Sequence, residues 1–171
     1  IGTDGFPVVA YRDITAERLR VVECTNLSCS THLTPTNILP PTPATDDAGI
    51  DPSIVIGTDG FPVISHHEQF EGDLLVTKCN DAACTGDNET TTRLDINNDP
   101  GVTSAIAIGT DGLPIVAHYA LDISALEVTS CDDAACTSGV TTVVDNSADV
   151  GYDASIVITP DGLPAIAAHD Q

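Results

Sequence analysis

The chain has 171 residues and a formal net charge of −21, from five Lys and Arg against 26 Asp and Glu. This balance argues against binding to nucleic acid or anionic membranes, because both need a basic face. No apolar run reaches the ~20 residues of a membrane-spanning helix, so no membrane insertion is expected. Hydrophobic residues make up 42% of the chain, which predicts a folded core rather than disorder.

A tandem repeat organises the whole chain. The pattern Ile-Gly-Thr-Asp-Gly-(Phe or Leu)-Pro begins at Ile1, Ile56 and Ile108, and a variant begins at Ile158. Each of the first three leading isoleucines precedes a cysteine by 23 residues, so the variation in unit length lies after the cysteines. Self-similarity at a period of about 50 residues is typical of repeat architectures. We therefore predict a single repeat domain over 1–171, with units at about 1–52, 53–103 and 104–154 and a partial unit at 155–171.

Each unit predicts four short strands. The expected first strands are 53–56, 104–108 and 155–158. The Thr-Asp-Gly that follows predicts a type I turn closed by a left-handed glycine. The expected second strands are 62–65, 114–117 and 164–167, the third 19–24, 74–79 and 126–131, and the fourth 90–94 and 140–144. Residues 16–21 look helical locally, but they align with the third strand of the other units.

Four antiparallel strands in each unit predict an all-β fold of β-propeller-like blades, with three full repeats plus a terminal hairpin. The alternative is a β-solenoid, whose coils are usually shorter and lack a hairpin ladder within the unit. Propellers typically close with at least four blades. We therefore expect either that this chain is part of a longer array or that partner copies complete the structure.

Two segments carry a resemblance to a known family. Residues 111–119 read Asp-Gly-Leu-Pro-Ile-Val-Ala-His-Tyr, and 75–85 read Leu-Val-Thr-Lys-Cys-Asn-Asp-Ala-Ala-Cys-Thr. They are similar to the tandem repeats of secreted bacterial proteins with a "DGLPVIAYYD…LKVAKCNDAACT" pattern. The resemblance covers nearly the whole chain, and the first unit departs from it most. It implies a propeller-like extracellular repeat array and no catalytic activity.

The six cysteines form three identical C-x4-C pairs. We predict three local disulfides: Cys24–Cys29, Cys79–Cys84 and Cys131–Cys136. The alternative is metal binding, but C-x4-C without histidine at a suitable spacing is poor for zinc. Disulfides persist in oxidising compartments, which favours an extracellular or cell-surface location.

Histidines and carboxylates recur at two places in the repeat and suggest a metal site. His66 and His118 stand near the ends of second strands, and the acids Asp47, Asp51, Asp149 and Asp153 belong to segments that lead into the next unit. Imidazole suits transition metals and carboxylate suits calcium, so calcium is the cofactor considered. The alternatives are that the histidines are packing residues, and that the D-x-G-x-D acids cap backbone amides in turns.

Two surface modifications are considered. Asn26 and Asn88 begin N-x-(S/T) sites in expected turns, where they are glycosylation acceptors if the source glycosylates. Residues 34–45 are rich in Pro and Thr and predict a stiff loop, with O-glycosylation as the functional alternative.

Catalysis has little support, because the chain has no G-x-S-x-G, H-E-x-x-H or phosphate-loop motif. The expected function is a non-enzymatic structural or adhesive protein that self-associates or belongs to a larger surface protein. The alternative is a lectin-like module that binds a glycan or a protein. The absence of Trp and an aromatic content of 4% weigh against sugar stacking.

Overall fold

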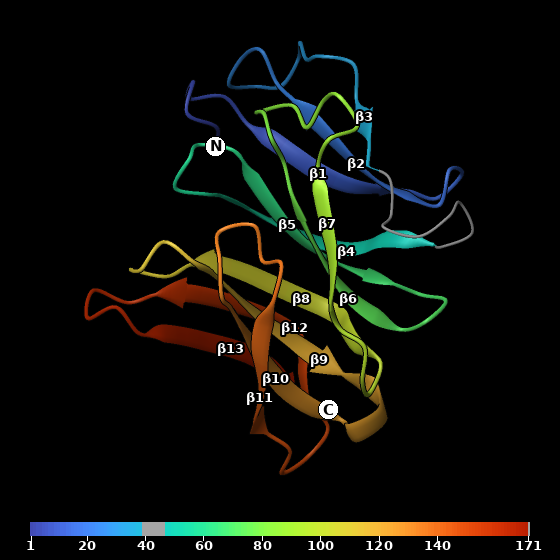
Figure 1. Cartoon of the computed structure of the whole chain (residues 1–171), viewed down its shortest axis with the longest axis vertical. Helices are drawn as coiled ribbons and strands as arrows, with labels where there is room; N and C mark the ends of the chain where they lie inside the picture. The colour runs from blue at the N-terminus through green and yellow to red at the C-terminus, as the bar shows by residue number, and fades with distance from the viewer. Residues whose placement is uncertain (39–46, 171) are drawn as a thin grey trace.

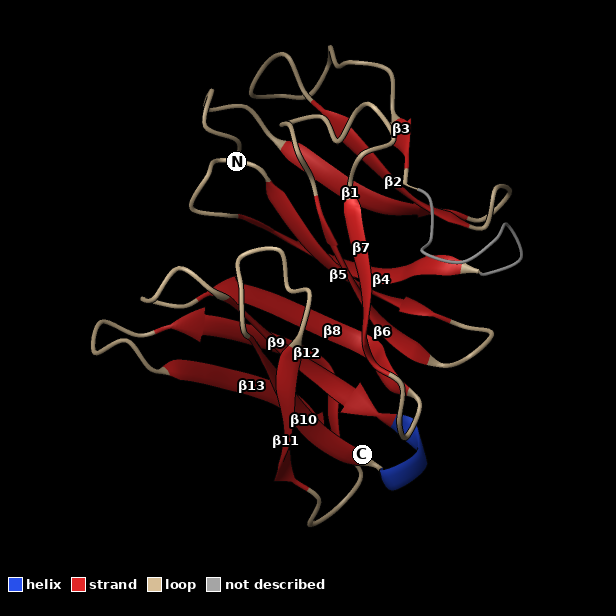
Figure 2. Cartoon of the chain, viewed as in Figure 1, coloured by secondary structure: helices blue, strands red, loops and turns tan. Residues whose placement is uncertain are grey.

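The computed structural model describes residues 1–38 and 47–170. These residues form four antiparallel sheets and one short 3-10 helix, Leu121–Ile123 (Figures 1 and 2), so the all-β prediction is confirmed. The first sheet holds β1 (Val8–Asp13), β2 (Arg18–Glu23) and β3 (Thr36–Asn37), and the second β4 (Ala48–Ile56), β5 (Pro62–Glu68), β6 (Asp73–Lys78) and β7 (Thr90–Asp95). The third holds β8 (Pro100–Ile108), β9 (Pro114–Ala120), β10 (Ala125–Cys131) and β11 (Gly139–Asp145), and the fourth β12 (Val150–Ile158) and β13 (Pro164–Asp170).

The Thr-Asp-Gly turns have the predicted left-handed glycine. Gly60 has φ 88°, and the Asp59 carboxylate accepts the Phe61 backbone N–H at 3.1 Å. A Cβ added to Gly60 would lie 2.8 Å from the Thr3 side chain of the preceding turn. The glycine thus serves both the turn and the close approach of consecutive units.

The first strand of each unit starts earlier than predicted. Residues 48–52, 100–103 and 150–154 were expected to lie outside these strands, yet they belong to β4, β8 and β12. Their pairing with the second strand is irregular, with register shifts before Ser53, Ser104 and Ser155. Each bulge adds a residue and so reverses the face on which the next side chain lies. The regular alternation of apolar and polar residues that would predict a strand is therefore interrupted.

The first strand of each later unit packs against the preceding sheet. β4 lies against both β1 and β8, and β8 also lies against β12, so the sheets follow one another in chain order (Figure 1). We call the contact of the first and second sheets the first joint. The contact of the second and third sheets is the second joint, and that of the third and fourth sheets is the third joint.

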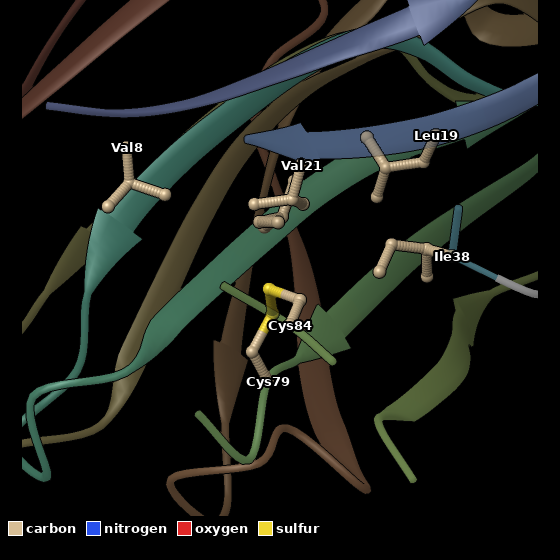
Figure 3. Packing of buried hydrophobic residues seen from close by; sticks show 7 residues of the cluster. Val8, Leu19, Val21, Ile38, Cys79 and Cys84 are labelled. Carbon is tan, nitrogen blue, oxygen red and sulfur yellow. A yellow bond between two sulfur atoms is a disulfide. The ribbon is translucent and has the colours of Figure 1, made fainter. Parts of the chain in front are cut away.

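The first two joints have equivalent cores. At the first joint, the disulfide of the second sheet packs under side chains of the first sheet, as Figure 3 shows for Cys79–Cys84 near Val21 and Ile38. The core of the first joint comprises Val8, Leu19, Val21, Ile38, Ile64, Cys79 and Cys84. The core of the second joint comprises Val63, Leu74, Val76, Ile106, Val116, Cys131 and Cys136. The invariant spacing from the repeat motif to the cysteines therefore places each disulfide against the preceding sheet.

Much of the Pro/Thr-rich segment 34–45 cannot be compared with its prediction. β3 (Thr36–Asn37) lies within it, but residues 39–46 lie outside the described part of the chain.

Candidate functional site

The ends of the second strands hold three side chains that reach the following sheet. Arg12 forms an ion pair with Asp47. His67 Nε2 lies 3.1 Å from Asp99 Oδ1, and the Tyr119 hydroxyl donates to Asp149 Oδ1 at 2.5 Å. The donor changes from guanidinium to imidazole to phenol, while the acceptor stays an Asp just before the next first strand. These pairs fasten each sheet to the next one.

His66 and His118 stand one residue earlier and are fully buried. In each, Nε2 contacts a threonine hydroxyl of the third strand, Thr77 at 3.0 Å and Thr129 at 2.9 Å. Burial lowers the pKa of His66 to about 3, and the neighbouring His67 adds to this effect. Burial lowers the pKa of His118 to about 4, although the Asp95 carboxylate acts in the opposite direction. Both imidazoles are therefore neutral at neutral pH.

The two histidines differ at their other ring nitrogen. His66 Nδ1 accepts the Gly49 backbone N–H at 3.2 Å. His118 Nδ1 is buried without a hydrogen-bond partner, and Glu127 Oε2, buried and also unpartnered, lies 4.0 Å away. Burial raises the pKa of Glu127, and the Asp95 carboxylate raises it further. Asp95, His118 and Glu127 place one ligand atom each within 4.8 Å of the others.

The predicted metal residues are not brought together as one group in the described part of the chain. The three-residue group just described contains His118, but not His66, Asp47, Asp51, Asp149 or Asp153. Asp47 and Asp149 are already bonded to side chains of the preceding sheet. His66 uses both ring nitrogens for contacts within its own sheet, and Asp51 and Asp153 are exposed.

The D-x-G-x-D segments are bulged strand, not the turns suggested as the alternative to calcium loops. Gly49 has φ 88°, and a Cβ on it would lie 2.5 Å from the Leu19 backbone nitrogen. Asp51 follows with φ 42°. The motif therefore lets the incoming first strand touch the backbone of the preceding sheet, a role that only glycine fills without strain.

Sequence reasoning missed Asp95 and Glu127. Asp95 recurs as Asp145 at the same register position of the following unit, whereas the position of Glu127 holds Leu75 in the preceding unit. The available signal was this replacement of a core residue by an acid. It becomes visible only after the strands are aligned in register.

The three predicted cysteine pairs are all present as disulfides: Cys24–Cys29, Cys79–Cys84 and Cys131–Cys136. Among them, Cys79, Cys84 and Cys136 have no exposed surface. Disulfides indicate an oxidising compartment and are consistent with a secreted protein. Across residues 1–38 and 47–170, no helix has the length and apolar character needed to cross a membrane.

The two glycosylation candidates lie between third and fourth strands. The Asn26 side-chain amide donates to Ser30 Oγ at 3.0 Å and to Thr31 Oγ1 at 2.7 Å, so attachment of a glycan would remove one of these two donated bonds. Asn88 is exposed.

An open depression of about 280 Å³ lies between the first and second sheets. It is lined by Glu17, Asp47, Gln69 and Phe70. Phe70 is 76% exposed and offers an aromatic face beside three polar side chains.

Comparison with known proteins adds no assignment: no protein-family model matches the chain, and no curated protein matches it significantly.

Proposed function

We propose that the protein is a non-enzymatic, extracellular structural or adhesive repeat protein that self-associates end to end. The third joint is the observation that carries this proposal. It has the frame of the first two joints, but the fourth sheet has two strands in the described part of the chain and covers less of its neighbour.

Exposure of equivalent residues measures the uncovered surface. Val76 of the second sheet has no exposed surface, whereas its equivalent Val128 is partly exposed. Leu94 packs against the core of the second joint, whereas its equivalent Val144 is 55% exposed. The third sheet thus presents apolar positions that the second sheet buries under a disulfide and two further strands.

The first sheet of a second copy is the proposed occupant. It brings a third strand, a short fourth strand and the Cys24–Cys29 disulfide, none of which has a counterpart in the fourth sheet among the described residues. Charge favours this pairing: residues 1–38 hold three Arg and four acids, while residues 94–171 hold twelve acids and no Lys or Arg. A near-neutral end would meet a strongly acidic end, which gives a head-to-tail contact.

Such a contact joins different surfaces of two chains, so it makes a ring if the rotation closes and a filament if it does not. The packing of each later unit's first strand against the preceding sheet supports blades of a propeller-like array in either case.

The test compares two substitutions on β11. Val144→Glu places a charge where the preceding unit packs Leu94, whereas Val140→Glu places one where that unit exposes Thr90. Electron microscopy and light scattering of native protein should show rings or filaments that Val144→Glu abolishes and Val140→Glu preserves. A monomer at all concentrations, or equal effects of both changes, would refute the proposal.

Glycan binding is a second candidate, favoured by the depression with the exposed Phe70 ring. Sugars stack on aromatic faces and hydrogen-bond to carboxylates and amides, and both are present there. A glycan array should give hits that Phe70→Ala removes. An array without hits would dismiss this candidate.

A further inference from the structure

The second joint contains a buried polar cluster, one member of which replaces an apolar residue of the first joint. His118 faces Glu127 across the β9–β10 ladder, and the equivalent His66 faces Leu75 across the β5–β6 ladder. Asp95 pairs with Leu74 in register, as Asp145 does with the equivalent Leu126 of the third sheet. The second joint therefore has Glu127 beside His118 where the first joint has Leu75 beside His66.

The cluster has the donor set of a metal site. It offers one imidazole nitrogen and two carboxylates, from β7 of the second sheet and from β9 and β10 of the third. His118 Nδ1 and Glu127 Oε2 are buried and lack any hydrogen-bond partner. Buried polar groups are nearly always paired, so two orphaned atoms that lie 4.0 Å apart point to a missing ligand between them.

Neighbouring hydroxyls orient the imidazole for this role. His118 Nε2 lies 2.9 Å from Thr129 Oγ1, and that oxygen lies 2.8 Å from Thr141 Oγ1. When Nε2–H donates to Thr129, the lone pair of neutral His118 sits on Nδ1 and faces the carboxylates. Metal-bound histidines are characteristically held this way, by a hydrogen bond from the other ring nitrogen.

Charge also favours a cation. Asp95 and Glu127 bury two carboxyl groups beside the His118 imidazole. Carboxylates without a counter-ion in a protein interior are strongly unfavourable. A divalent ion would offset two negative charges.

We propose that Asp95, His118 and Glu127 bind a divalent transition metal such as Zn²⁺, which fastens the second sheet to the third. Mixed nitrogen and oxygen donors suit zinc, whereas calcium takes six to eight oxygens. Tetrahedral zinc places its ligand atoms about 3.4 Å apart, so the cluster would contract by about 1 Å on binding. All three ligands belong to one chain, so the site is independent of the proposed self-association.

The test titrates untagged, chelator-treated protein with Zn²⁺ by calorimetry and measures bound metal by mass spectrometry. One Zn²⁺ should bind per chain and raise the melting temperature. Glu127→Leu, which installs the residue of the first joint, should abolish this binding, and Glu127→Gln serves if the leucine variant misfolds. Thr129→Val should weaken binding by about 10–100-fold, as expected for a residue that orients a ligand.

His66→Ala is the matched control, because it removes a histidine with the same burial and the same threonine contact but no carboxylate neighbours. It should leave zinc binding unchanged. Absence of zinc binding in the wild-type protein would overturn the proposal. Equal binding by wild type and both Glu127 variants would also overturn it, because the ion would then sit on exposed acids. Displacement of zinc by excess Ca²⁺ would overturn the choice of a transition metal.

Discussion

The first and second joints share one frame but differ in the chemistry that they enclose. In each joint, a disulfide and an aliphatic residue from the second strand of the unit pack beneath the preceding sheet. The first joint has Leu75 beside His66, whereas the second has Glu127 beside His118, with Asp95 close to both. A tandem repeat can therefore keep its packing constant while one copy acquires a polar site, because Leu75 and Glu127 lie outside the two cores.

The largest test of this comparison puts an acid into the apolar joint. Ile38→Asp should lower the free energy of unfolding by about 3–5 kcal/mol, because it buries one carboxylate among apolar side chains with no partner. Urea denaturation measures the change. A loss as small as that of a surface substitution would show that the first joint accepts polar residues as readily as the second.

The disulfides offer the next contrast. The double variant Cys79→Ala and Cys84→Ala should lose about 2–5 kcal/mol, since this disulfide is buried in the first joint. Removing Cys24–Cys29 should cost about 2 kcal/mol, the value for closing so short a loop. Cys29 is only partly buried and lies outside both cores. Equal losses by thermal or urea unfolding would mean that burial adds nothing to the crosslink.

The polar joint can be converted into the apolar one. In metal-free protein, Glu127→Leu should stabilise the fold by about 1–4 kcal/mol, as replacement of buried charges by packed aliphatic groups often does. The measurement is urea denaturation in the presence of chelator. A destabilised variant would show that Glu127 has a favourable interaction even without metal.

The smallest expected difference between the two joints is in how much stability each loses in mild acid. The pKa of His66 is lowered to about 3. In mild acid, His66 is therefore protonated in the unfolded chain but stays neutral in the folded protein. The stability from His66 is fully present above its unfolded pKa of about 6.5 and falls as pH drops below that value. Between about pH 7 and pH 5 this loss amounts to about 2 kcal/mol, and His66→Ala should remove it.

His118 should contribute less of this acid sensitivity. Its pKa is lowered to about 4, but the raised pKa of Glu127 lets the folded state bind a proton as pH falls, which acts in the opposite direction. His118→Ala should therefore remove a smaller part of the pH dependence than His66→Ala. Equal slopes in urea denaturation across this pH range would contradict the difference between the joints.

The sequence alone determined the all-β class, the strand order within a unit and the cysteine pairing. These features follow from local physics: Asp-Gly turns need a left-handed residue, alternating side chains define a strand, and cysteines five residues apart pair across one turn. The invariant spacing from Ile56 to Cys79 and from Ile108 to Cys131 also signalled a rigid frame.

Only the tertiary structure decided where the first strands begin and which acids meet a histidine. Bulges at Gly49 and Asp51 break the alternation that would have revealed the start of β4. The sequence suggested Asp47 and Asp149 as metal ligands. Packing of consecutive sheets instead pairs Asp47 with Arg12 and hydrogen-bonds Asp149 to Tyr119. Asp95 comes to His118 from a different sheet, and residues that meet through sheet packing leave no fixed spacing in the sequence.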